Sequence, residues 1–284
     1  MVWPRTRADV RLRLSAPGPD VIERKDIEGS SPRSDNNDAF GLPERSISGR
    51  IVPPSRFPIA EFRATPQYGC VIERKAGERF SCSLRFERKL YQQGFQRIAG
   101  IDEAGRGPLA GPVIAAAVML PPNFRLRGLN DSKQLSYLAR ESYYETLISN
   151  PEVVIGIGLA SAAEIDQINI LRATHLAMQR AVSGLVSVPE HLLVDGLPVS
   201  TFSLPQTAII DGDARSFSIA AASVIAKVTR DRMMVSWHEE FPVYEFARNK
   251  GYGTPEHLEK LRSHGPCLLH RRTFTPVAQT YLPL

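Results

Sequence analysis

Four acidic residues in this sequence have the type and spacing to hold a divalent metal: Asp102, Glu103, Asp195 and Asp213. Each lies at or shortly after the end of a short apolar run, in residues 98–101, 192–194 and 208–210. Carboxylates gathered at neighbouring strand ends repel one another, and an unpaired buried carboxylate is costly. A bound cation removes that cost, and hard oxygen ligands suit Mg²⁺ or Mn²⁺ rather than zinc. Together the four acids indicate a shared metal site, although a single aspartate at such a position is more often a turn or cap residue.

A shared site places a condition on the strand that carries the first two acids. Successive strand residues point to opposite faces of a sheet, so Asp102 and Glu103 meet at one site only if their strand ends there. The segment 104–108 contains two glycines and a proline. Its composition predicts that the strand ends directly after the two acids.

Apolar periodicity and turn residues predict alternating strands and helices from about residue 86 onward. Strands are expected at 97–102, 113–120, 153–159, 192–195 and 206–210, and helices at 87–93, from Asp131 or Ser132 to 148, at 171–185 and at 217–240. Ser161 and Glu164 have the spacing of a capping box, which opens a further helix. A hairpin followed by alternating helices and strands implies an α/β fold, with a mixed five-stranded sheet flanked by helices.

Residues 1–84 differ in character from the rest of the chain. Turn and breaker clusters such as 29–32 and 53–55 interrupt a segment with little apolar periodicity. Such a segment cannot bury enough apolar surface to offset its ordering entropy. We therefore expect a disordered extension, residues 1–84, followed by one catalytic domain, residues 85–284. Two explanations for the extension stay open: a tether for an unknown partner, or an artefact of an upstream start codon.

Composition limits the class of protein. Three cysteines far apart in 284 residues do not form a disulfide framework, and they suit a reducing cytosol. No stretch approaches the roughly 20 apolar residues of a membrane helix, so we expect a cytoplasmic protein without membrane contact. The formal net charge of +5 fits a nucleic-acid partner. It argues weakly, because the excess is divided between residues 1–84 and the rest.

From about residue 86 to residue 284, a series of motifs resembles bacterial ribonuclease HII. The opening motif is Asp102-Glu103-Ala104-Gly105-Arg106-Gly107-Pro108-Leu109-Ala110-Gly111-Pro112-Val113. After it come Asn130-Asp131-Ser132-Lys133-Gln134-Leu135-Ser136, Glu164-Ile165-Asp166 with Asn169-Ile170, Val194-Asp195-Gly196, Gly212-Asp213, Ala221-Ala222-Ser223, Ala226-Lys227-Val228-Thr229-Arg230-Asp231, Lys250-Gly251-Tyr252-Gly253-Thr254 and His270-Arg271-Arg272. Many motifs in one order are far more specific than a lone short pattern.

The resemblance implies a ribonuclease H-like fold and a metal-dependent endoribonuclease of the ribonuclease H class. Such an enzyme hydrolyses the RNA strand of RNA–DNA hybrids and nicks duplex DNA at embedded ribonucleotides, leaving 3′-hydroxyl and 5′-phosphate ends. The implied metal ligands, for Mn²⁺ or Mg²⁺, are Asp102, Glu103, Asp195 and Asp213. Two such ions activate a water and stabilise the leaving oxygen of an in-line displacement. The expected partner is a hybrid, or a DNA duplex containing ribonucleotides, and the expected state is a monomer.

The resemblance also implies a set of nucleic-acid contacts: Gly105, Arg106, Gly107, Ser132, Lys133, Ser223, Lys227 and Tyr252. Glycines let the backbone approach a sugar closely, and the 2′-hydroxyl distinguishes RNA from DNA. Tyr252 is expected to pack on the neighbouring deoxyribose, and the serines and lysines to contact phosphates. Ser223 and Lys227 are four residues apart on a helix and share a face. The alternative for Lys227 is an ion pair with Asp231.

Two positions depart from the family pattern. The family commonly has a lysine where this chain has Asp211, and often a histidine where it has Asn249. In an extended segment Asp211 would share a face with Asp213, and would then weaken phosphate binding or compete as a metal ligand. Asn249 is expected to change contacts at the RNA–DNA junction and to spare the metal site.

Other histidines and a cysteine are interpreted as structural. His264, Cys267 and His270 have a spacing that hints at zinc, but a structural zinc normally needs four ligands. His175 lies on an apolar helix stripe and is expected to be partly buried. Two alternatives to an active ribonuclease HII are considered. One is a ribonuclease HIII-like nuclease, whose opening motif lacks Gly-Arg-Gly, and the other is a catalytically weak hybrid-binding module.

Overall fold

A computed structural model describes residues 71–72, 82–129, 132–133 and 135–281. The strands are β1 (Val71–Ile72), β2 (Ile98–Ala104), β3 (Val113–Met119), β4 (Val154–Ala160), β5 (His191–Asp195) and β6 (Gln206–Ile209). The α-helices are α1 (Arg85–Gln92), α2 (Tyr137–Ser149), α3 (Ala162–Ser183), α4 (Phe217–Glu240), α5 (Phe246–Asn249), α6 (Pro255–His264) and α7 (Thr275–Ala278). Short 3₁₀ turns are η1 (Gly212–Ala214), η2 (Pro242–Tyr244) and η3 (Gln279–Tyr281).

The strands form one mixed sheet in the order β1-β6-β5-β2-β3-β4. The pairs β2–β3 and β3–β4 are antiparallel, and the first of them is the hairpin that the sequence predicts. The pairs β2–β5 and β5–β6 are parallel. The five expected strands are confirmed, and the two-residue strand β1 is added parallel to β6. Within the segment 1–84, for which the sequence predicts an extension that is largely disordered, the structure describes Val71, Ile72 and residues 82–84, and residues 1–70 and 73–81 lie outside the described part.

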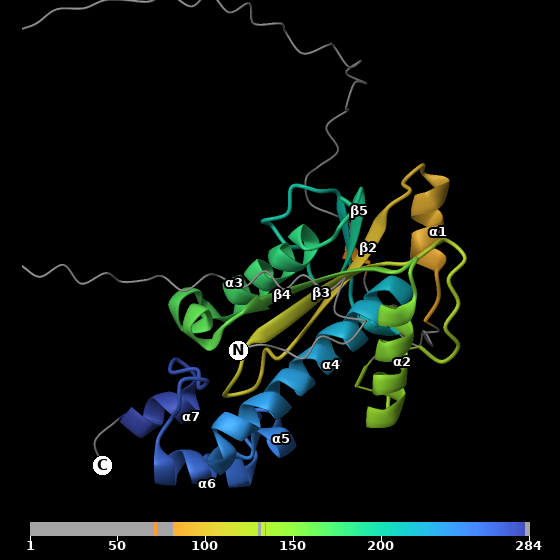
Figure 1. The fold of residues 1–284 in the computed structure, drawn as a ribbon. Coiled ribbons are helices and arrows are strands. Elements are labelled where there is room, and N and C mark those ends of the chain that lie inside the picture. The colour runs from red at the N-terminus through yellow and green to blue at the C-terminus, as the bar shows by residue number, and fades with distance from the viewer. Residues whose placement is uncertain (1–70, 73–81, 130–131, 134, 282–284) are drawn as a thin grey trace, which may run out of the picture. The chain divides into compact units, whose positions relative to one another are not determined.

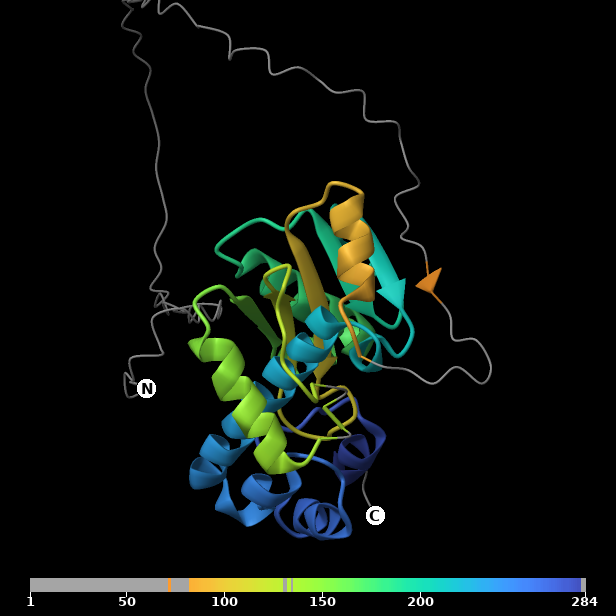
Figure 2. The same cartoon turned by 90° about the vertical axis from the view of Figure 1, so that its right-hand side faces the viewer.

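Helices cover both faces of this sheet, with α3 on one face and α4 on the other (Figures 1 and 2). Strand β3 contributes to both cores because its side chains alternate between the faces. Ile114 and Val118 pack towards α2 and α4, whereas Val113 and Ala117 pack towards α3. All seven residues of β3 are buried, which explains why its sequence is a continuous apolar run. The α/β fold class is confirmed.

Close packing of α4 on the sheet sets the position of this helix beside β2. Residues 220–222 of α4 are alanines with no exposed surface. A Cβ added at Gly100 of β2 would lie 2.1 Å from the carbonyl carbon of Ser218, so only glycine fits there. The contact brings the first turns of α4 directly against the strand that carries Asp102.

The helix ends follow the local sequence with two refinements. Ser161 and Glu164 form the expected capping box at the start of α3. Within α3, Asn169 has φ 68° and ψ 164°, so the helix is kinked where the sequence predicts two separate helices. Helix α2 does not begin near Asp131 or Ser132, because Ser136 is its N-cap and accepts from Ala139 N.

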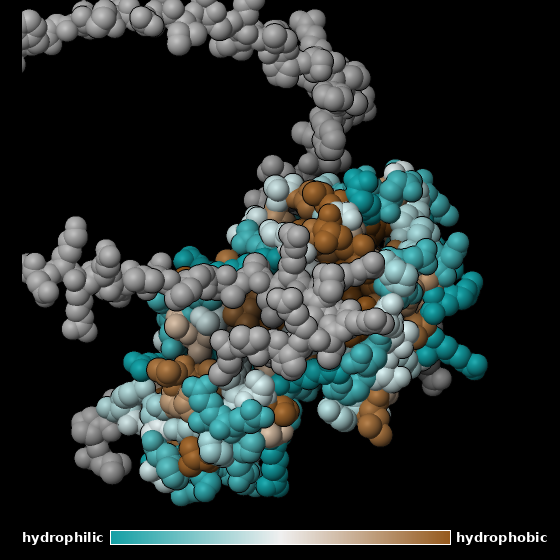
Figure 3. Space-filling model, viewed as in Figure 1, coloured by the Kyte–Doolittle hydropathy of each residue, from teal (hydrophilic) through white to brown (hydrophobic). Residues whose placement is uncertain are grey.

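The short helices α5, α6 and α7 gather beyond one end of α4, away from the sheet (Figure 1). The face seen in Figure 3 is hydrophilic over much of its outer rim, with apolar residues in separate smaller patches. Among the helices of the described residues, none is long and apolar enough to cross a membrane.

Candidate active site

Strand β2 carries the first two acids and continues past them to Ala104. The strand thus ends at Ala104, within the segment 104–108 that the sequence predicts as its end and one residue after the two acids. Pairing of β2 with β3 runs on to Ala104, whereas its pairing with β5 stops at Ile101. From Asp102 onward the β5 side of β2 is an open edge. Both carboxylates can reach round this edge although their Cβ atoms point to opposite faces of the sheet.

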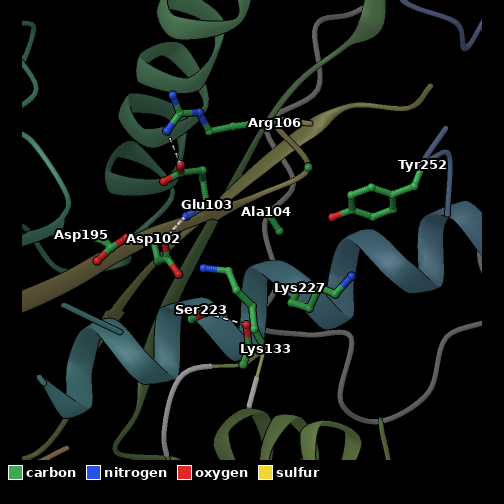
Figure 4. Close-up of a pocket in the computed structure, with 11 residues that line it drawn as sticks. Asp102, Glu103, Ala104, Arg106, Lys133, Asp195, Ser223, Lys227 and Tyr252 are labelled. Carbon is green, nitrogen blue, oxygen red and sulfur yellow. Dashed lines mark hydrogen bonds and ion pairs between the residues drawn. The ribbon is translucent and has the colours of Figure 1, made fainter. Parts of the chain in front are cut away.

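A pocket of about 250 Å³ opens at this edge (Figure 4). Its lining residues are Asp102, Glu103, Ala104, Gly105, Arg106, Ser132, Lys133, Asp195, Ser223, Lys227 and Tyr252. Three of the four predicted ligands and seven of the eight predicted nucleic-acid contacts thus line or help to line one pocket, together with Ala104. Gly107 and Asp213 are the two predicted residues outside this lining.

The acid cluster, defined as Asp102, Glu103, Asp195 and Asp213, is electrostatically strained. Burial, followed by the charges of Asp195, Glu103 and Asp213, raises the pKa of Asp102 well above its usual value. Burial and the charge of Glu103 likewise raise the pKa of Asp195 to about 6. Asp195 Oδ1 accepts a hydrogen bond from Gly212 N at 2.7 Å, which opposes that rise. Like charges at close range in a buried site form the donor set that a divalent cation would stabilise.

Basic side chains pair with two members of the acid cluster. Arg106 Nη1 lies 3.1 Å from Glu103 Oε1, and Lys133 Nζ lies 3.5 Å from Asp213 Oδ2. The Lys133 side chain is 81% exposed, so it can leave Asp213 at little cost. Within the described ranges, no three Asp, Glu, His or Cys side chains already stand at metal-ligating separations. The chemistry of the oxygen donors fits Mg²⁺ or Mn²⁺, and the carboxylates would have to draw together around it.

Helix α4 presents its predicted contacts to the same pocket. Ser223 Oγ lies 2.8 Å from Ser132 Oγ, and both serines are almost fully buried. Lys227 Nζ lies 2.9 Å from Asp231 Oδ1, which is the ion pair that the sequence offers as the alternative to phosphate contact. The Tyr252 ring is 43% exposed, and its centre lies 5.6 Å from Lys227 Nζ (Figure 4).

The two departures from the family pattern are clear of the pocket lining. Asp211 is exposed and has a left-handed φ of 53° before the turn η1, so the chain there is not extended and Asp211 does not share a face with Asp213. Asn249 supports the loop that carries Tyr252. Its Nδ2 donates to Tyr244 O at 2.6 Å, and its Oδ1 accepts from Gly251 N at 2.7 Å.

The residues that hint at zinc are engaged in hydrogen bonds. His270 Nδ1 accepts from Cys267 N at 3.0 Å, and His270 Nε2 lies 3.0 Å from His257 Nε2. The His264 ring lies within hydrogen-bond distance of Ser263 Oγ.

His175 is partly buried as the sequence predicts, whereas the burial of two arginines near the pocket was not predicted. His175 is half-buried on α3, and its pKa is lowered by burial and by the charge of Arg106, with Glu103 acting the other way. Arg230 and Arg271 are fully buried. The two arginines sit in segments that have the composition of ordinary helix or surface sequence, and only tertiary packing reveals that they are buried.

The mixed sheet, its helices and the carboxylates at the open edge define a ribonuclease H-like protein. A sequence model of ribonuclease HII matches residues 99–277. The chain belongs to the ribonuclease HII family, whose members are nucleases that act on RNA–DNA hybrids.

Two bacterial relatives are similar over most of their length. Ribonuclease HII of Geobacillus thermodenitrificans is 55% identical over 73% of this chain and 79% of its own. Ribonuclease HII of Bacillus subtilis is 51% identical over 72% of this chain and 80% of its own. Among solved structures, ribonuclease H2 of Pyrococcus horikoshii has a TM-score of 0.55 and 27% identity, over 65% of this chain and 96% of that one.

Proposed function

We propose that this member of the family nicks duplex DNA at embedded ribonucleotides, besides cutting the RNA strand of hybrids, by two-metal hydrolysis that leaves 3′-hydroxyl and 5′-phosphate ends. The observation that carries the proposal is the shared pocket. It brings carboxylates from β2 and β5 together with the basic and hydroxyl groups of α4 and with Tyr252. Acids alone would suit a metal-binding protein, whereas this combination suits a phosphodiester between two sugars.

The acid cluster is the proposed ligand set for Mn²⁺ or Mg²⁺. Divalent ions held by Asp102, Glu103, Asp195 and Asp213 would supply an activated water and stabilise the leaving 3′-oxygen. The chain's own part is to bring the carboxylates to one open edge of the sheet, from which they would draw together around the cations. Burial and mutual repulsion raise the pKa values of Asp102 and Asp195, so the carboxylates gain most when a cation neutralises them.

The groups around the acids are proposed to bind the nucleic acid. Ser223 and Lys227, with Ser132 and Lys133, would bind phosphates, for which Lys227 would exchange its Asp231 partner. Gly105, Arg106 and Gly107 are proposed to read the 2′-hydroxyl through their backbone. Tyr252 would pack on the next sugar, where a deoxyribose marks the junction.

A cleavage assay on a duplex with one embedded ribonucleotide tests this function. Wild type with Mn²⁺ or Mg²⁺ should nick the duplex at the embedded ribonucleotide, and the product should carry a 3′-hydroxyl. Asp102→Asn should leave almost no product while keeping the fold, as circular dichroism would verify. Equal cutting by both proteins would end the assignment of the acids. Binding of hybrids without cleavage in either metal would instead favour the binding-module alternative.

A further inference from the structure

Two arginines behind the pocket have no exposed surface, and the proposed function gives them no part. Arg230 lies on α4, three residues after Lys227, and Arg271 lies between α6 and α7. A buried guanidinium is expensive unless its N–H groups are satisfied. Each of the two donates from all three of its nitrogens to main-chain carbonyls, as set out below, and we refer to them as the arginine pair.

Arg271 donates hydrogen bonds to the loop formed by residues 105–112, which we call the opening loop. Its Nη1 donates to Arg106 O at 2.8 Å, its Nε donates to Gly111 O at 3.0 Å, and its Nη2 donates to Gly105 O. In a trans peptide the C=O and the following N–H point in opposite directions. With the carbonyls of Gly105 and Arg106 turned towards Arg271, the N–H groups of Arg106 and Gly107 are turned away from it. Two consecutive amide donors are thereby oriented for an oxygen outside the protein.

Arg230 connects this loop to the one that carries Tyr252. Its Nε donates to Pro112 O at 3.0 Å and its Nη2 to Ala110 O at 2.9 Å, both in the opening loop. Its Nη1 donates to Lys250 O at 2.9 Å, two residues before Tyr252. One rigid, planar group therefore fixes the distance between the two loops that are proposed to contact successive sugars.

The backbone of the opening loop packs closely against Arg230. Gly105 has φ +95°, and a Cβ there would lie 2.1 Å from Arg230 Nε. The loops also bind each other directly, since Leu109 N donates to Gly251 O at 2.8 Å. The opening loop, Arg230 and the loop that carries Tyr252 thus form one packed unit, in which a shift of one part moves the others.

Asp166 holds the chain beside Arg271. Its carboxylate accepts from Arg272 N and Thr273 N, each at 2.9 Å, and from Thr273 Oγ1 at 2.7 Å. These bonds fix the two residues that follow Arg271. Asp166 belongs to a sequence motif for which the proposed function has no role, and this anchoring accounts for it.

We propose that Arg230 and Arg271 are positioning residues for ribonucleotide selection: Arg271 aims the amides of Arg106 and Gly107 outward, and Arg230 sets their distance from Tyr252. The inference rests on the proposed function and deepens it. Neither arginine touches the substrate. Lysine could keep the charge at either position, but it cannot reproduce a planar fork that reaches three separate carbonyls.

Binding measurements separate selection from chemistry. We would compare affinities, in Ca²⁺ to suppress cleavage, for a DNA duplex with one embedded ribonucleotide and for the same duplex made only of DNA. Arg271→Lys and Arg230→Lys should each lose about tenfold of the preference for the ribonucleotide, the equivalent of one well-made hydrogen bond. Affinity for the DNA duplex should change by less than about twofold, because the phosphate contacts remain.

A matched control removes an arginine–carbonyl contact elsewhere. Arg180 on α3 donates to Leu159 O at 2.7 Å and pairs with Glu164 at 2.8 Å, away from both loops. Arg180→Lys should lower thermal stability without changing the preference. A loss of preference in this control equal to that in Arg271→Lys would show a general effect of stability and would overturn the proposal.

Asp166→Ala keeps the proposal testable if the arginine variants do not fold, because the position is only half-buried. It should reduce the preference in the same direction by a smaller factor, with Mn²⁺ binding unchanged. An unchanged preference in folded Asp166→Ala and arginine variants refutes the role of the arginine pair. A wild type that binds both duplexes equally would instead refute the proposed ribonucleotide selection itself.

Discussion

The acid cluster and the arginine pair lie on two sides of the same opening loop and bury charge in opposite ways. The six donor contacts of the arginine pair all end on carbonyls of the chain. In the acid cluster, Arg106 pairs with Glu103 and Lys133 with Asp213, and burial together with neighbouring carboxylates raises the pKa values of Asp102 and Asp195. The two guanidinium charges are thus satisfied by the backbone, whereas the repelling carboxylates are proposed to gain from a bound divalent cation.

The largest effect that would sharpen this comparison is expected from Asp195→Asn. Asparagine keeps an oxygen for the bond from Gly212 N, so local structure should survive. Activity should fall by about a thousandfold or more, because a proposed metal ligand loses its charge. In EDTA, the free energy of unfolding should rise by about 1 kcal/mol, since a repelling charge is removed.

The arginine pair should respond with the opposite sign. Arg271→Lys should lower the free energy of unfolding by about 2 kcal/mol, because buried carbonyls lose their donors. Urea denaturation of both variants in EDTA makes the comparison. If Asp195→Asn destabilises the metal-free protein as much as Arg271→Lys does, the two regions do not differ as the electrostatics indicate.

Metal binding should remove the difference between the two regions. At Mn²⁺ concentrations of about 100 times the dissociation constant, the folded state should gain about 2.7 kcal/mol. Calorimetry would show this as a rise in melting temperature that EDTA reverses. Asp195→Asn should lose most of the gain, whereas Arg180→Lys should keep it. An equal gain in both variants would place the bound metal somewhere other than the acid cluster.

The sequence predicted those elements whose formation depends mainly on neighbouring residues. The apolar run of β3, the capping box at Ser161 and the end of β5 at Asp195 are readable because each depends on neighbouring residues. The end of β2 lies one residue after the two acids because Ala104 still pairs with Ile114 of β3, which is a tertiary contact. Strand β1 was not predicted, because two residues alone carry no periodicity and the strand is defined by its pairing with β6.

The sequence predicted which residues line the site, but not how buried arginines hold its loops. Acids at strand ends and the ordered motifs led to the residues that line the pocket. Arg230 and Arg271, in contrast, have the sequence appearance of surface cations, and nothing local distinguishes them from Arg272. The condition attached to Asp211, an extended segment, is not met, because its backbone is left-handed and this conformation cannot be deduced from residue type.

The smallest expected effect concerns pH, and it separates Asp195 of the acid cluster from the buried histidine His270 by sign. Burial, with the charge of His257, lowers the pKa of His270 from 6.5 to about 4, and this histidine belongs to the packing around the Tyr252 loop. Below pH 6.5 the unfolded chain therefore takes up a proton that the folded chain refuses until about pH 4, so stability falls through that window. For Asp195 the folded pKa of about 6 lies above the usual 3.8, so the folded metal-free protein binds the extra proton and this group adds stability as pH falls through 6.

Denaturation at about pH 7.5 and about pH 5.5 would resolve the two contributions by difference. His270→Asn keeps an acceptor near Cys267 N but does not titrate, so it should be less stable than wild type at both values and should lose about 1 kcal/mol less on acidification. Asp195→Asn should show the reverse, with a steeper loss than wild type, because the group that favours the folded state at low pH is gone. Identical pH slopes in all three proteins would mean that neither the buried histidine nor the buried aspartate is perturbed as its surroundings require.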